Sequence, residues 1–270
     1  MPSIAKPYRP LPINSLYGKH AGETIFVIGT SYSLNDTNLE LTEGYTKIGI
    51  NRAIRRISSE YLSMSESCVF DACRDVIEEE RPILLLYAPC ARQLGTKLAN
   101  IPYTMTKLED RDGHKIGPRG QKEDFIWNKL TPEHPYYKFY PDKRQIAQPG
   151  AIQADGLFLR SNSNCIYALE WAFRMLKNDQ KKPGLVILLG IDLRRKEPRN
   201  KRSLTYIPEI NTLSVHDRGV RLPSPERIAP HLGRAHEVMA EENIRLVNGS
   251  PESGPLDEFL PRERLEELLK

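Results

Sequence analysis

Short apolar runs alternate with amphipathic segments along most of this chain. The apolar runs are bounded by glycine, proline, asparagine or charged residues, which is typical of strands buried in a sheet. The predicted strands are residues 24–28, 47–50, 67–70, 83–87, 185–189 and 244–247. The predicted helices are residues 37–43, 52–57, 73–80, 164 to before 183, 225–242 and 262–269. Because strands and helices alternate, we expect a Rossmann-like α/β fold, with a mostly parallel sheet and helices on both faces.

Two segments depart from this alternation. Residues 1–22 contain four prolines, at positions 2, 7, 10 and 12, which predict an irregular N-terminal arm. Residues 95–150 are rich in proline, glycine, lysine and aromatic side chains and have no long apolar period. A loop of this length is typically functional, so we interpret it as a lid or insertion beside a site. Residues 23–270, with this insertion, are predicted to be a single nucleotide-binding α/β domain.

Composition narrows the class of protein only slightly. Of the 270 residues, 39% are apolar, and the formal net charge is +4. We find no apolar run long enough to span a bilayer and no apolar core of a secretory signal, so we expect a cytoplasmic protein. The four cysteines form no CxxC pair, so we expect them to be reduced and mostly buried, with no metal site.

Positive charge is concentrated in one short segment after the strand at 185–189. Its basic residues are Arg194, Arg195, Lys196, Arg199, Lys201 and Arg202. Such a cluster attracts phosphate groups, whether of a nucleotide or of nucleic acid. An exposed loop with no binding role explains the same composition.

Small or polar residues follow several of the predicted strands. In open α/β sheets, ligands bind beyond the carboxyl ends of the strands, where such residues would meet. Gly29 permits a sharp turn, and Thr30, Ser31 and Ser33 offer hydroxyl and backbone N–H groups for a phosphate or a ribose. Comparable positions after the other strands hold Asn51, Asp71, Asp192 and Asn248. The competing interpretations are an ordinary glycine turn, Asx turns at the asparagine and aspartate positions, and a strand-end hydrogen bond for Asp192.

Several stretches resemble the family 42 sialyltransferases and the related motility-accessory-factor and 6-hydroxymethylpterin diphosphokinase-like proteins. They are VIGTSYSLND, KIGINRA, YLSMSESCVFD, SNSNCIYALEWAFRML followed by GLVILLGIDL, and NIRLVNGSPESGPLDEF. The middle of the chain and residues 195–225 match the family poorly. The resemblance implies the sialyltransferase-like variant of the Rossmann-like fold.

The resemblance also implies roles for individual residues. Nucleotide and sugar would be held by Gly29, Thr30, Ser33, Asn51 and Asp71. Residues 161–164, which include Ser163 and Asn164, would hold the donor at a helix N-terminus, where anions are favoured. Arg160 would face a donor carboxylate or phosphate. The catalytic base would be His216, oriented by Asp217, while Tyr206 would stabilise the leaving phosphate.

The chain departs from the family pattern at three places. Thr30 and Tyr32 stand where the family has asparagine and proline, and Ser163-Asn164 or Asn164-Cys165 replaces its Ser-Gly pair. The donor therefore need not be CMP-sialic acid.

Three functions are compatible with these observations. The leading hypothesis is an inverting glycosyltransferase that needs no metal or other cofactor. It would use a nucleotide-sugar donor and an acceptor that is a glycan, a small molecule or modified nucleic acid. The second is a pterin-type diphosphokinase using ATP and Mg²⁺, with Asp71 and Asp192 as metal ligands. The third is a nucleotide- or nucleic-acid-binding protein without catalysis. A homo-oligomer is compatible with each.

Overall fold

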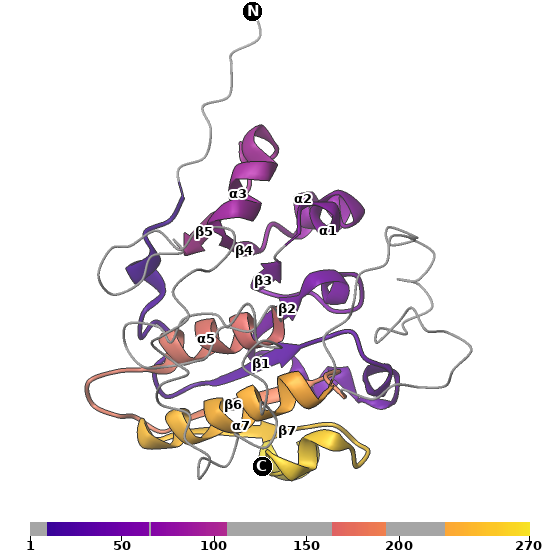
Figure 1. Ribbon diagram of the computed structural model, residues 1–270, viewed down its shortest axis with the longest axis vertical. Helices are drawn as coiled ribbons and strands as arrows, with labels where there is room; N and C mark the ends of the chain where they lie inside the picture. Colours follow the sequence, from indigo (N-terminus) through magenta and orange to yellow (C-terminus); the bar gives the residue numbers. More distant parts are fainter. Residues whose placement is uncertain (1–9, 65, 107–163, 193–224) are drawn as a thin grey trace, which may run out of the picture.

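A seven-stranded parallel sheet forms the centre of the protein (Figure 1). The computed structural model describes residues 10–64, 66–106, 164–192 and 225–270. The strands are β1 (Thr24–Ile28), β2 (Thr46–Ile50), β3 (Tyr61–Met64), β4 (Ile83–Tyr87), β5 (Tyr103–Thr106), β6 (Gly184–Leu189) and β7 (Ile244–Asn248). They lie in the order β5-β4-β3-β2-β1-β6-β7, and every pairing is parallel. The chain therefore builds outward from β1 to β5 and then returns to add β6 and β7 on the other side of β1.

Helices cover both faces of this sheet. The α-helices of the described residues are α1 (Ser67–Ala72), α2 (Arg74–Glu80), α3 (Ala88–Leu94), α5 (Asn164–Leu176), α7 (Pro225–Glu241) and α8 (Leu265–Leu268). Short 3-10 helices are η1 (Ile13–Leu16), η2 (Tyr32–Asp36), η3 (Leu39–Thr42), η4 (Asn51–Arg55), η5 (Gly95–Leu98) and η9 (Pro255–Glu258). None of these described helices combines the length and apolar character needed to cross a bilayer.

Alternate strand residues divide between two packed layers. Val27, Ile48 and Val186 pack with buried residues of α5 and α7. These two helices lie over the same face of the sheet (Figure 1). On the opposite face, Leu62 and Leu84 pack with α1, α2 and α3, while other strand residues pack with η2, η4 and α8. A strand buried on both faces is mostly apolar, which is why β1 reads TIFVI. The expected Rossmann-like α/β fold is confirmed.

Most predicted elements lie within a few residues of their expected bounds, but one strand was wrong. Residues 67–70 begin helix α1, and the third strand is β3 at Tyr61–Met64. Val69 and Phe70 of α1 and Cys73, which follows its last residue, fall on one face and are buried. A short apolar run cannot by itself distinguish a strand from a buried helix turn. The true strand was not predicted because it contains Ser63, a polar residue at a fully buried position.

One α-helix and one strand were missed, besides the short 3-10 helices η1, η2, η5 and η9. Helix α3 follows β4, and edge strand β5 lies inside residues 95–150, which we expected to form a lid. The segment YTMT shows no apolar run, because Thr104 stands at a fully buried position, where its hydroxyl donates to the Leu11 carbonyl at 3.1 Å. Residues 107–150 of the expected lid lie outside the described residues.

Three of the four cysteines are buried, as expected. Cys73, Cys90 and Cys165 are buried, and Cys68 is partly exposed. Burial raises the pKa of Cys90 to about 11 and that of Cys165 to about 12. Both thiols are therefore protonated and unreactive near neutral pH.

His231 on α7 makes the stability of the fold depend on pH. Its Nδ1 is buried, although the residue keeps some exposed surface, and burial lowers its pKa to about 4. In the unfolded chain the imidazole titrates near pH 6.5. Between these values the unfolded state binds a proton that the folded state does not. The free energy of unfolding should therefore fall by roughly 1–3 kcal/mol as the pH drops from about 6.5 to about 4.

Urea unfolding near neutral pH and at about pH 4.5 measures this change. His231→Gln should show a smaller decrease than the wild type, because glutamine does not titrate. His236→Gln on the same helix is the matched control and should retain the full decrease. An equal decrease in the wild type and His231→Gln would show that His231 is not responsible.

Candidate functional site

The carboxyl ends of the parallel strands meet at one edge of the sheet. The turn at residues 29–33 follows β1, Asn51 follows β2, and Asp192 lies just beyond β6. Because β1 lies between β2 and β6, the winding direction of the chain reverses here. Crevices at such reversals are where open α/β sheets bind their ligands. We call these residues, together with Ser63 and Asn164, the strand-end site.

Gly29 is required by a neighbouring strand end. Its N–H donates to the Leu189 carbonyl at 2.8 Å, and the Ser31 N–H donates to the Gly190 carbonyl at 2.8 Å. A Cβ on Gly29 would lie only 2.3 Å from the Gly190 oxygen. Gly190 itself has a φ of +61°, a conformation that favours glycine. The space that a side chain at Gly29 would need is thus already occupied by other atoms of the protein.

Asp192 holds the turn after β1 in place. Its carboxylate accepts the Ser33 N–H at 2.9 Å and also accepts the Ser33 hydroxyl. Asp192 is 9% exposed and Ser33 is 3% exposed. The expected strand-end hydrogen bond of Asp192 is therefore confirmed. The N–H groups of residues 29, 31 and 33 are all engaged within the protein, so the turn has fewer donors for a phosphate than its sequence suggested.

Three polar side chains from distant parts of the chain meet beside this turn. Asn164, the first residue of α5, donates from Nδ2 to Asn51 Oδ1 and, at 3.2 Å, to the Ser63 carbonyl. The Ser63 hydroxyl lies 3.5 Å from Asn164 Oδ1. Ser63 and Asn164 are buried, and Asn51 is partly exposed. The sequence predicted Asn51 and Asn164 for one site, but it did not indicate Ser63, which lies within β3.

The backbone of Asn51 adopts a left-handed conformation, with a φ of +54°. Asparagine tolerates this region better than other residues except glycine. Unusual backbone conformations of this kind concentrate at functional sites. At the same edge, the N-terminus of α5 presents N–H groups that have no partner within the helix and that favour an anion.

Asp71 does not belong to the strand-end site. It lies on helix α1, is exposed, and forms an ion pair with Lys97 at 2.6 Å. The prediction depended on a strand at residues 67–70, which is a helix, so the expected strand-end position is wrong. Asp71 and Asp192, the metal candidates of the diphosphokinase hypothesis, are each engaged by a different partner, Lys97 and Ser33 respectively.

Asn248 ends β7, as expected, but organises the loop that follows. Its Nδ2 donates to Asp257 at 3.0 Å, and its Oδ1 accepts the Ser250 N–H at 3.1 Å. Among the other predicted residues, Thr30 is buried and Ser31 is partly exposed. The following predicted residues lie outside the described part of the chain: Arg160, Ser163, Tyr206, His216, Asp217 and the basic residues 194–202.

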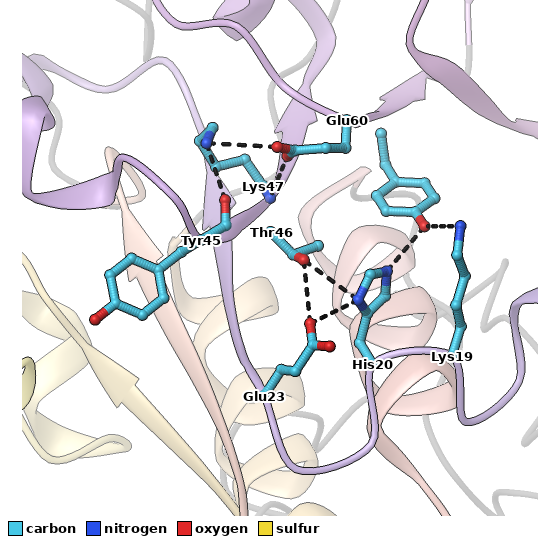
Figure 2. A network of polar contacts seen from close by, with 8 residues as sticks. Lys19, His20, Glu23, Tyr45, Thr46, Lys47 and Glu60 are labelled. Atoms are coloured by element: carbon cyan, nitrogen blue, oxygen red, sulfur yellow. Dashed lines mark hydrogen bonds and ion pairs between the residues drawn. The ribbon is translucent and has the colours of Figure 1, made fainter.

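The opposite, amino-terminal edge of the sheet holds a polar network that the sequence did not indicate (Figure 2). His20 Nδ1 lies 2.8 Å from Glu23 Oε2, and His20 Nε2 lies 2.9 Å from the Tyr61 hydroxyl. Lys19 donates to the same hydroxyl at 3.0 Å. These contacts fix the N-terminal arm against β3.

The same arm caps the C-terminus of α5. The N–H groups of Gly18 and His20 donate to the Arg174 and Met175 carbonyls at 2.9 and 2.8 Å. Terminal carbonyls of a helix have no partner within the helix, so these bonds stabilise its last turn. Because Asn164 begins α5, the arm also anchors the helix that carries part of the strand-end site.

No metal centre is evident in residues 10–64, 66–106, 164–192 and 225–270, where no group of three or more His, Cys, Asp and Glu side chains is placed to hold an ion. Comparison of the chain with protein-family models and with curated proteins finds no match. Functional inference therefore rests on the strand-end site itself.

Replacing Gly29 by alanine tests the close approach of β1 and β6. The new Cβ would meet backbone, which cannot move aside easily, so we expect the free energy of unfolding to fall by at least about 2 kcal/mol. Gly184→Ala is the control, because its Cβ would make ordinary contacts at 3.4 Å with Ile244 and Leu176. Urea unfolding of both variants measures the difference, and equal stabilities would contradict this role of Gly29.

Proposed function

We propose that this protein is a glycosyltransferase that binds the nucleotide part of a nucleotide-sugar donor at the strand-end site. The observation that carries the proposal is the meeting of Asn51 and Asn164 beside the N-terminus of α5. Neutral amides suit the oxygens of a base or ribose, and a helix N-terminus suits a phosphate. The resemblance to family 42 sialyltransferases pointed to these same two residues.

Within this proposal, the phosphate lies at the N-terminus of α5 and not in the turn after β1. Three N–H groups of that turn already donate to Leu189, Gly190 and Asp192. The Asp192 carboxylate also disfavours an anion close to Ser33. The turn then forms a rigid wall of the site, against which the base or sugar packs.

The proposed reaction is a metal-independent inverting displacement. His216 removes the proton of an acceptor hydroxyl, whose oxygen attacks the anomeric carbon of the sugar. The bond to the nucleotide breaks, and its electron pair leaves with the phosphate oxygen, stabilised by Tyr206. Asp217 orients His216, and Arg160 and Ser163 contact the donor. We also propose that the chain has the sialyltransferase-like variant of the fold, with a lid within residues 95–150.

Binding of nucleotides to the full chain tests the site. We expect isothermal titration with CMP, UMP, AMP and GMP to detect at least one ligand. Asn51→Gly should weaken that binding at least about tenfold, equivalent to about 1.4 kcal/mol, because a hydrogen bond is lost without straining the backbone. Asn100→Gly is the control, since Asn100 is exposed and precedes β5 at the opposite edge of the sheet.

Turnover of labelled nucleotide sugars separates an enzyme from a binding protein. His216→Ala should bind nucleotide as the wild type does but lose transfer and hydrolysis. Nucleotide binding without turnover by the wild type would favour the non-catalytic alternative. A wild-type protein that binds none of the nucleotides would contradict the proposal.

A further inference from the structure

The hydrogen bonds among Ser63, Asn164 and Asn51 determine which end of each side-chain amide is the nitrogen and which is the oxygen. We propose that they orient the Asn51 amide so that it presents N–H donors, and not its oxygen, to the ligand. The group bound there must then be a hydrogen-bond acceptor, namely an oxygen of a base, a sugar or a phosphate. This inference rests on the proposed function, because it concerns the ligand of the same site.

The orientation originates at the Ser63 carbonyl. A backbone carbonyl can only accept hydrogen bonds, so the Asn164 atom that lies 3.2 Å from it must be the amide nitrogen. The Ser63 hydroxyl, which can donate, lies 3.5 Å from the other end of the amide, the oxygen. Reversing Asn164 would place its oxygen against the carbonyl oxygen. Ser63 is fully buried and Asn164 is 9% exposed, so water could not relieve that repulsion.

Asn164 passes this orientation on to Asn51. The Asn164 nitrogen carries two hydrogens, and one of them is donated to Asn51 Oδ1. A reversed Asn51 would set its own N–H groups against those of Asn164. Asn51 Oδ1 is therefore engaged inside the protein, and Nδ2 is the end of the amide that remains.

The Asn51 nitrogen is positioned to donate outward. Asn51 is partly exposed. Within the described part of the chain, its Nδ2 donates to no acceptor. Its left-handed backbone, with a φ of +54°, limits the directions that its side chain can take. Ser63 and Asn164 are thus positioning residues, and Asn51 is the residue that selects an acceptor.

Two substitutions at residue 51 separate a donor from an acceptor. Asn51→Asp keeps the shape and still accepts from Asn164, but it has no N–H to offer. Asn51→Gly keeps the backbone conformation and leaves room for water. If Asn51 donates, Asn51→Asp should bind the best nucleotide at least about tenfold more weakly than the wild type, and more weakly than Asn51→Gly. Binding by Asn51→Asp equal to or tighter than that of the wild type would overturn the inference.

Binding of the corresponding nucleosides, which lack the charged phosphate, identifies the acceptor. If Asn51→Asp weakens nucleoside and nucleotide binding alike, the acceptor is a base or sugar oxygen. If it weakens nucleotide binding alone, the acceptor is a phosphate oxygen. Melting temperatures of both variants show whether each is folded. If Asn51 had a merely structural role, Asn51→Gly would not bind the nucleotide more tightly than Asn51→Asp.

Side-chain amide NMR tests the orientation without any ligand. The Asn51 signals are identified by their loss in Asn51→Asp, and the Asn164 signals by their loss in Asn164→Asp. In the free wild-type protein, the Asn164 amide protons should exchange slowly and those of Asn51 rapidly. Slow exchange of the Asn51 amide protons, or rapid exchange of the Asn164 amide protons, would overturn this inference but not the proposed function. Failure of the wild type to bind any nucleotide would instead overturn the proposed function, and the donor role with it.

Discussion

The close approach of the backbones at the ends of β1 and β6 is the constraint on which the other features depend. Gly29 and Gly190 pack with no room for a side chain on Gly29, and Asp192 then reaches back to Ser33. This contact joins the two halves of the sheet at the position where its winding reverses. It also sets the shape of the wall beside Asn51 and Asn164. The turn acts as a rigid boundary because three of its N–H groups and the Ser33 hydroxyl are already hydrogen-bonded.

The two ends of α5 are fixed by different parts of the chain. At its C-terminus, the arm at residues 18–20 caps two carbonyls, and His20 ties that arm to Tyr61. At its N-terminus, Asn164 bonds to Ser63 and Asn51. Such a helix can move little along its axis without breaking bonds at both ends. Catalytic and binding groups benefit from support of this kind, because their geometry must be held closely.

The sequence predicted the fold class and most elements because strands buried on both faces leave continuous apolar runs. It placed Asn51 at this edge because parallel strands end on the same side, and it assigned Asn164 to the same site through the resemblance to family 42 sialyltransferases. It was wrong for Asp71, because SCVF suits a buried helix turn as well as a strand. It missed Ser63, a polar residue within β3, and the network around His20, because their partners lie far away along the chain. Hydrogen bonds between distant segments leave no periodic pattern in a sequence.

The strand order also bears on how the protein is made. β1 precedes the other described strands in the chain, yet it lies in the interior of the finished sheet and pairs with β6, which is synthesised only after β2 to β5. Until β6 arrives, one side of β1 is an open apolar edge that can pair with other chains. Contacts between such distant segments also slow folding. A nascent chain shortened before residue 184 would therefore expose β1, whose apolar residues are fully buried in the folded protein, and chaperones would be expected to act at that stage.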